Sequence, residues 1–217
     1  MTTKELYQAL GLDLGQLPID KVQEGFLNNG FALIYQPDHF PLAETLTKYR
    51  KDLGKRTPIA SMELVWSAHV GPHQIISGFV HSPTAERHIQ TLDLLGEKNI
   101  ILIQGLEGGT DISTSRITKA TNVKNKSKSL LTINPYQYSF NAKDIEFKNI
   151  KEWASQGKDA LEGHGPLYEI LIWNAGVYFW IAGISSDITQ GIELARKSIL
   201  SGSAKETLEH LIRWSRN

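Results

Sequence analysis

Two carboxylates in a glycine-rich stretch are the first candidates for chemistry. Glu107 and Asp111 lie in the sequence GLEGGTD, directly after the apolar run NIILIQ. In proteins Mg²⁺ is often held by one or two carboxylates together with phosphate oxygens of a substrate, so this pair could bind magnesium. The glycines could bring backbone N–H groups close to an anion, although the lysine of a P-loop and the GxGxxG pattern are both absent. Gly and Asp also favour turns for conformational reasons alone, and a plain loop is the third interpretation.

Other residue types that are used in catalysis add no motif. The chain has no cysteine, which excludes a disulfide framework, a thiolate nucleophile and a cysteine-based metal site. Four histidines lie close in the sequence without an HExxH or similar spacing, and we interpret them as core or solvated residues: His69, His73, His81 and His88. A GxSxG elbow is also absent. We therefore assign no catalytic residue from these motifs.

A basic segment is the second candidate site. Residues 112–143 contain no acidic residue, although the whole chain balances 23 basic against 23 acidic residues. We define the basic segment as residues 116–143, and its cationic residues are Arg116, Lys119, Lys124, Lys126, Lys128 and Lys143. Such a block can bind the phosphate backbone of a nucleic acid. The alternative is an ordinary solvated hairpin, because basic runs are common on surfaces.

The elements that would position these groups alternate between strand and helix. Apolar runs predict buried strands, and apolar residues at helical spacing predict helices. The predicted elements are strands at residues 31–35, 73–81 and 99–104, helices at 41–54 and 82–96, a hairpin-rich part at 115–138 and a helical part at 149–214. This order favours an α/β fold with a central, largely parallel sheet flanked by helices. Ligands gather at the carboxyl ends of such strands, which is where GLEGGTD lies.

Length and composition favour one soluble domain. A chain of 217 residues can bury a sizeable core, and we expect a single α/β domain over residues 1–217. The first residues carry a capping box from Thr2 to Glu5 and no signal-peptide pattern. Residues 166–184 approach membrane-spanning length, but Glu169 and Asn174 interrupt the run, which favours a core helix. We therefore expect a cytoplasmic protein that makes no membrane contact.

The segment YRKDLGKRT, residues 49–57, is similar to a motif of a known family. It resembles the R-x-x-L-G-x-R-T motif of the anthranilate phosphoribosyltransferases, which belong to glycosyltransferase family 3. Three later segments resemble the family in the same order: HQIISGFVHSPTAERHIQTLDLLG, IILIQGLEGGTDIS and WNAGVYFWIAGISSDITQGIELARKSILSGSAKETLEHL. The resemblance implies the fold of the C-terminal part of the phosphoribosyltransferase and nucleoside phosphorylase type of catalytic domain.

The resemblance also implies an activity, a cofactor and ligands. Family members transfer the phosphoribosyl group of phosphoribosyl pyrophosphate to an aromatic amine in tryptophan biosynthesis, with Mg²⁺. Arg50 matches the arginine that holds the anthranilate carboxylate, a role suited to the planar guanidinium, and Arg56 and Thr57 match the second half of the motif. Asp111 matches one carboxylate of the family's Asp-Glu magnesium pair, and Glu107 matches the acidic position before the glycine.

The resemblance covers the later two-thirds of the family's length. The family's N-terminal helical domain and its GTGGD loop, which binds the diphosphate, have no counterpart in this sequence. We therefore expect a phosphoribosyltransferase-like chain that is incomplete or inactive alone, in a homo-oligomer or with a partner that supplies the missing part. Two alternatives are a non-catalytic paralogue that binds nucleic acid through the basic segment, and an interaction domain that binds neither ligand.

Overall fold

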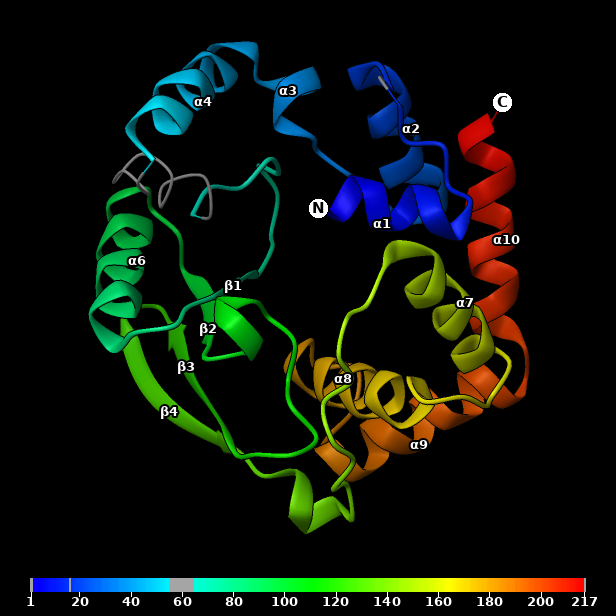
Figure 1. Cartoon of the computed structure of the whole chain (residues 1–217). Coiled ribbons are helices and arrows are strands. Elements are labelled where there is room, and N and C mark those ends of the chain that lie inside the picture. The colour runs from blue at the N-terminus through cyan, green and yellow to red at the C-terminus, as the bar shows by residue number, and fades with distance from the viewer. Residues whose placement is uncertain (1, 16, 55–64, 217) are drawn as a thin grey trace. The chain divides into compact units, whose positions relative to one another are not determined.

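The computed structural model describes residues 2–15, 17–54 and 65–216. The chain forms two compact units, whose helices and strands are labelled in Figure 1. The first unit comprises Met1–Thr57, Glu146–Tyr168 and Ser198–Asn217, and the second comprises Pro58–Ile145 and Glu169–Lys197. The expectation of a single domain over residues 1–217 stays a prediction.

The regular structure in the described part of the first unit is helical. Its helices are α1 (Thr3–Leu10), α2 (Ile19–Asn29), α3 (Gln36–His39), α4 (Pro41–Leu53), α7 (Ile150–Leu161) and α10 (Ser203–Arg216). The predicted capping box is confirmed, because the Thr2 side chain accepts from the Glu5 backbone N–H and the Glu5 carboxylate accepts from the Thr2 backbone. The core of this unit contains Leu12, Leu14, Leu211 and Trp214.

The strand predicted at residues 31–35 does not form. These residues follow Gly30, which ends α2 in the left-handed conformation with φ +65°, and they have no strand pairing. Phe31 and Leu33 instead pack against the core of the helical unit, and Phe31 meets the ring of Tyr7 edge to face at 5.4 Å between centroids. The apolar run therefore serves a helix–helix core, which sequence pattern alone does not separate from a buried strand.

The second unit contains a four-stranded sheet in the order β1–β2–β3–β4. The strands are β1 (Ile75–Gly78), β2 (Asn99–Ile103), β3 (Thr118–Lys124) and β4 (Ser127–Ile133). The predicted α/β class is confirmed, but the sheet is mixed rather than largely parallel: β1 and β2 are parallel, and the other two pairings are antiparallel. The hairpin turns at Asn125 and Lys126, both with positive φ, and so short a connection can join only antiparallel strands.

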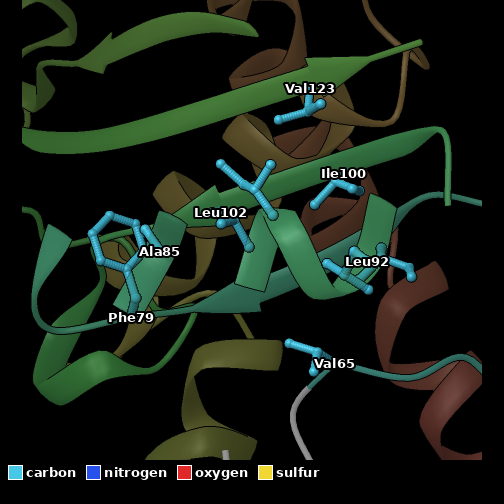
Figure 2. Packing of buried hydrophobic residues seen from close by; sticks show 9 residues of the cluster. Val65, Phe79, Ala85, Leu92, Ile100, Leu102 and Val123 are labelled. Atoms are coloured by element: carbon cyan, nitrogen blue, oxygen red, sulfur yellow. The ribbon is translucent and has the colours of Figure 1, made fainter. Parts of the chain in front are cut away.

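Helix α6 (Ser82–Leu94) connects β1 to β2 and covers one face of the sheet (Figure 2). The apolar core between them consists of Val65, Ile75, Phe79, Ala85, Ile89, Leu92, Ile100, Leu102 and Val123. Strand β2 is buried on both faces, since Ile101 and Ile103 on the opposite side are also buried. This double burial explains the continuous apolar run that made β2 predictable from the sequence.

Two further helices, α8 (Tyr168–Ile181) and α9 (Ile188–Leu200), lie mainly in the second unit. Their backbones approach closely, because a Cβ at Gly191 would lie only 2.1 Å from the Gly176 carbonyl oxygen. Helix α8 has no exposed residue, as predicted for a core helix. Among the described residues, no helix has the length and apolar character that crossing a membrane requires.

Candidate functional site

The glycine-rich stretch forms a tight loop between β2 and the segment that leads to β3. A short 3₁₀ turn, η1 (Leu106–Gly108), follows β2. The Leu106 N–H donates to the Asp111 carbonyl at 3.0 Å, and the Gly109 N–H donates to the Leu106 carbonyl at 2.8 Å. We call residues 105–111 the acidic loop. These hydrogen bonds close the loop on itself.

Glycines in the acidic loop and at the end of β1 allow close contact between backbone segments. A Cβ at Gly105 would lie 2.3 Å from the Gly109 carbonyl oxygen, and one at Gly78, the last residue of β1, would lie 2.2 Å from the Gly108 carbonyl oxygen. Gly108 also has φ +83°. The glycine pattern is therefore explained by close packing within the loop at Gly105 and of the loop on the end of β1 at Gly78.

Both carboxylates of the acidic loop face solvent. Glu107 and Asp111 are exposed, and neither side chain has a hydrogen-bond or ion-pair partner in the described part of the chain. Glu107 also adopts φ +50°, which is uncommon for a residue other than glycine. No group of three or more acidic or histidine side chains suited to a metal occurs among the described residues. The donor set is thus two free carboxylates, which fits Mg²⁺ completed by ligand oxygens and not a closed protein cage.

Helix α8 holds the backbone that follows the acidic loop. The Ile112 N–H donates to Asn174 Oδ1 at 2.8 Å, and Asn174 Nδ2 donates to the Ile112 carbonyl at 3.0 Å. The same Nδ2 donates to the Ile170 carbonyl one turn earlier in α8, also at 3.0 Å. Both polar atoms of this partly buried amide group therefore have partners, as polar groups away from water require.

Two aromatic residues of α8 contribute further hydrogen bonds to this backbone. The Tyr178 hydroxyl donates to the Thr110 carbonyl at 2.6 Å. Burial, and to a smaller extent the negative charge of Asp111, raise the pKa of Tyr178 to about 12, so the hydroxyl stays protonated at neutral pH. Trp173, which is fully buried, donates from Nε1 to the Ser113 carbonyl at 3.1 Å.

A second group of hydrogen bonds holds the segment after Ile112. The hydroxyls of Ser113 and Ser115 donate to the carboxylate of Asp144 at 3.0 and 2.9 Å. Between them, the Thr114 hydroxyl donates to the Ala142 carbonyl at 2.9 Å. This segment is therefore fixed on one side by α8 and on the other by residues 142–144.

The arginine motif belongs to the first unit. Arg50 lies in the last turn of α4 and is partly exposed. Arg56 and Thr57 lie outside the described residues. Gly54 ends α4 with φ +61°, so the glycine of the motif has the conformation that a helix stop requires.

The structure does not gather the basic segment on one surface. Along β3 and β4, strand alternation places Lys119 and Lys128 on the sheet face that α6 covers and Lys124 on the other face. Lys128 pairs with Glu86 of α6 at 2.8 Å, and Lys126 pairs with Asp93 at 3.4 Å. Within the described residues, Arg116, Lys119, Lys124 and Lys143 are exposed without an acidic partner.

Sequence reasoning did not assign the residues that hold the acidic loop. Trp173 and Tyr178 lie in the run 166–184, which was predicted only as a core helix, and Asn174 was noted only as an interruption of that run. That interruption was the available signal, because a polar amide in a buried helix must find partners. No pattern in the sequence indicates that Asp144 would accept from two serines about 30 residues earlier.

Comparison with known sequences places these features in a family. A sequence model described as "Glycosyl transferase family, a/b domain" matches residues 3–205. The chain belongs to this family. Among curated proteins, it is 27% identical over 217 residues to the anthranilate phosphoribosyltransferase of Thiobacillus denitrificans and 26% identical over 218 residues to that of Chromobacterium violaceum. These matches cover 97% and 98% of this chain but only 62% and 63% of the relatives.

Solved structures of the family have the same fold. The anthranilate phosphoribosyltransferase of Saccharomyces cerevisiae in complex with PRPP and Mg superposes with a TM-score of 0.82 at 20% identity, over 98% of this chain and 62% of that chain. The enzyme of Thermus thermophilus gives a TM-score of 0.74 at 21% identity, over 98% of this chain and 64% of that chain. The fold predicted from the resemblance is therefore confirmed, for a chain that spans less than two-thirds of these relatives.

Proposed function

We propose that this chain supplies the magnesium-binding and acceptor-binding parts of a phosphoribosyl transfer site. Family membership and the two partner-free carboxylates of the acidic loop support the proposal. The donor is phosphoribosyl pyrophosphate, a ligand that the yeast relative binds together with Mg. The acceptor is an aromatic amine that carries a carboxylate. A cytoplasmic location belongs to the same proposal.

Glu107 and Asp111 are the residues that would hold Mg²⁺. When bound, the ion neutralises charge that develops on the departing diphosphate. The two side chains are exposed and form no ion pair with a cation among the described residues, so they remain available for an ion whose other ligands are phosphate oxygens and water. Asp111 directly follows Thr110, whose carbonyl accepts a hydrogen bond from Tyr178 of α8, whereas Glu107 itself has a positive φ.

Arg50 is the residue proposed to bind the acceptor. Its guanidinium can form two parallel hydrogen bonds with a carboxylate, which orients the acceptor as well as attracting it. Its place in the last turn of α4 also puts the positive charge at the helix end that carries partial negative charge. Arg56 and Thr57 are proposed to act with it on the evidence of the motif alone.

The leaving-group half of the reaction needs further residues. Phosphoryl and diphosphate groups are stabilised mainly by positioned donors and positive charge, and no second glycine-rich loop of the GTGGD type occurs in this sequence. Because the chain spans 62% of the length of its relative, we propose that such a loop comes from residues outside this sequence. Catalysis by the chain alone should then be weak or absent while ligand binding persists.

The decisive test of the magnesium role is a substitution in the acidic loop. Calorimetric titration with phosphoribosyl pyrophosphate in the presence of Mg²⁺ should show at least roughly tenfold weaker binding for Asp111→Asn. Asp20→Asn, which removes another exposed aspartate in the first turn of α2, is the matched control and should bind as the wild type does. Equal binding by both variants would contradict the proposal.

Nucleic-acid binding is the second candidate function. It is supported by the four exposed cations of the basic segment that have no acidic partner in the described residues, namely Arg116, Lys119, Lys124 and Lys143. This function requires positive charge on the surface and no catalytic side chain. It predicts that the affinity for nucleic acid falls steeply as the salt concentration rises. Binding that survives high salt would contradict it.

A further inference from the structure

We propose that Asn174 and Tyr178 are positioning residues that fix the backbone on both sides of Asp111 and thereby set the affinity for magnesium. This inference rests on the proposed function, because it assigns a role in the same site. In the described structure neither residue forms a hydrogen bond with the Asp111 carboxylate, which would bind the ion. Both act through the peptide groups next to it.

The first observation is that the two hydrogen bonds hold the peptide groups on either side of a single residue, Asp111. We call this pair of hydrogen bonds the bracket. Tyr178 donates to the carbonyl of Thr110, which directly precedes Asp111, and Asn174 accepts from the N–H of Ile112, which directly follows it. The backbone of Asp111 itself is held too, since its carbonyl accepts from the Leu106 N–H. Three consecutive residues thus have a hydrogen-bonded backbone atom, while the Asp111 side chain has no hydrogen-bond partner among the residues that the structure describes.

The second observation is that the bracket is built from one face of one helix. Asn174 and Tyr178 are four residues apart in α8 and therefore lie one above the other on the same side. Helix α8 is held by its own close packing against α9 at Gly176 and Gly191. The acidic loop consequently takes its position from a rigid element, as a precise binding site requires.

The third observation concerns the chemistry of the two donors. Asn174 uses its carbonyl oxygen and its amide nitrogen at the same time, so no aliphatic or acidic residue of equal size can replace both bonds. Ile112 is fully buried, so its N–H and carbonyl would lose their partners without access to water if the amide were removed. The Tyr178 hydroxyl donates to the Thr110 carbonyl at 2.6 Å, and a phenylalanine of the same shape has no group that could form this bond.

Two variants test the bracket with a matched control. Tyr178→Phe removes one hydroxyl and keeps the ring, and Asn174→Leu keeps the side-chain volume and removes the amide. Tyr136→Phe is the control, because Tyr136 also donates its hydroxyl to a backbone carbonyl of this segment, but at Ser115, four residues beyond Asp111. All three variants retain Glu107 and Asp111.

The first readout is the dependence of phosphoribosyl pyrophosphate binding on Mg²⁺, measured by calorimetry. We expect the magnesium concentration for half-maximal enhancement to rise roughly tenfold in Tyr178→Phe and in Asn174→Leu, and to stay at the wild-type value in Tyr136→Phe. An equal response of all three variants would overturn the inference. No binding by the wild type would overturn the proposed function instead.

The second readout needs no ligand. Backbone hydrogen exchange at Ile112 should become faster in Asn174→Leu, because its N–H loses its acceptor, while exchange at Ile101 and Ile103 of β2 should keep its wild-type rate and show that the sheet is intact. Unchanged exchange at Ile112 would overturn the bracket even if the wild type binds magnesium. Faster exchange with unaltered magnesium affinity would show that the bracket is structural only, which would also overturn the inference.

Discussion

Ser113 donates its hydroxyl to the carboxylate of Asp144 across 31 residues of chain, at 3.0 Å. Ser115 donates to the same carboxylate at 2.9 Å. One acidic side chain therefore holds residues 113–115, which follow the acidic loop. Asp144 is also the first acidic residue after the basic segment. The free energy of this interaction can be measured without any ligand.

Replacement of Asp144 by alanine should destabilise the protein. The change removes the acceptor of two hydroxyls, and hydrogen bonds to a charged group contribute about 1.5 to 3 kcal/mol when buried. Because Asp144 is exposed, we expect a smaller effect than for a buried acceptor, a loss of about 1 to 2 kcal/mol in the free energy of unfolding by urea. Asp20→Ala is the control, and an Asp144→Ala variant as stable as this control would contradict the assigned role.

Two glycine-to-alanine changes should have opposite effects. A Cβ at Gly78 would lie 2.2 and 2.3 Å from the carbonyl oxygens of Gly108 and Gly109, so Gly78→Ala must displace the acidic loop and should cost about 1 to 3 kcal/mol of unfolding free energy. A Cβ at Gly157 in α7 would meet Leu10 at an ordinary 3.5 Å, so Gly157→Ala should stabilise by up to about 1 kcal/mol. Thermal unfolding of both variants tests this, and a neutral Gly78→Ala would show that the loop does not pack on β1 as described.

Stability should fall in mild acid because of His88. This side chain is buried in α6, and neither of its ring nitrogens has a hydrogen-bond partner in the described structure. Burial lowers the pKa of His88 below its usual 6.5. The folded state therefore favours the neutral form of His88. The protein keeps its full stability above pH 6.5 and loses stability as the pH falls through the lowered pKa that His88 has in the folded state.

A substitution isolates this effect of pH. The free energy of unfolding of the wild type should decrease more between pH 7.5 and pH 5 than that of His88→Leu, which has no group to protonate at this position. His210→Gln, which removes an exposed histidine of α10, should keep the wild-type pH dependence. Identical pH profiles for wild type and His88→Leu would rule out the burial argument.

The nucleic-acid alternative can be tested by comparing paired with unpaired cations. Neutralisation of Arg116, Lys119 and Lys124 to glutamine should weaken DNA or RNA binding and lower the salt dependence, by about 1 in the logarithmic slope for each phosphate that the protein no longer neutralises. Neutralisation of Lys126 and Lys128 should have a smaller effect, since each already pairs with an acidic residue of α6. Equal effects of both sets, or no binding by the wild type, would remove this alternative.

The parts of the fold that local sequence determines were predictable. Helix α4 starts at Pro41 and ends before Gly54, and α6 carries Pro83 in its first turn. Proline at a helix start and glycine after a helix end are local signals, so these boundaries could be predicted from the sequence. Strand β2 was predictable because a strand buried on both faces is continuously apolar. The mixed pairing of the sheet was not, because the direction of a neighbouring strand depends on interactions far away in the sequence.

The candidate site was predictable only in part. Glu107 and Asp111 were identified from residue type and turn context, and they lie on one loop that ends β2. The residues that hold this loop come from α8, about 60 residues later in the chain. In the sequence, the signal of such hydrogen bonds is a polar residue, Asn174, within an apolar helix. The sequence does not indicate which residue is its hydrogen-bond partner.

Calorimetric titration of the wild-type chain with phosphoribosyl pyrophosphate, with and without Mg²⁺, tests the central claim most directly. We predict saturable binding that requires or is strongly enhanced by magnesium, because the two free carboxylates of the acidic loop bind the ligand through the ion. Absence of binding in both titrations, or binding of equal strength with and without magnesium, would contradict it.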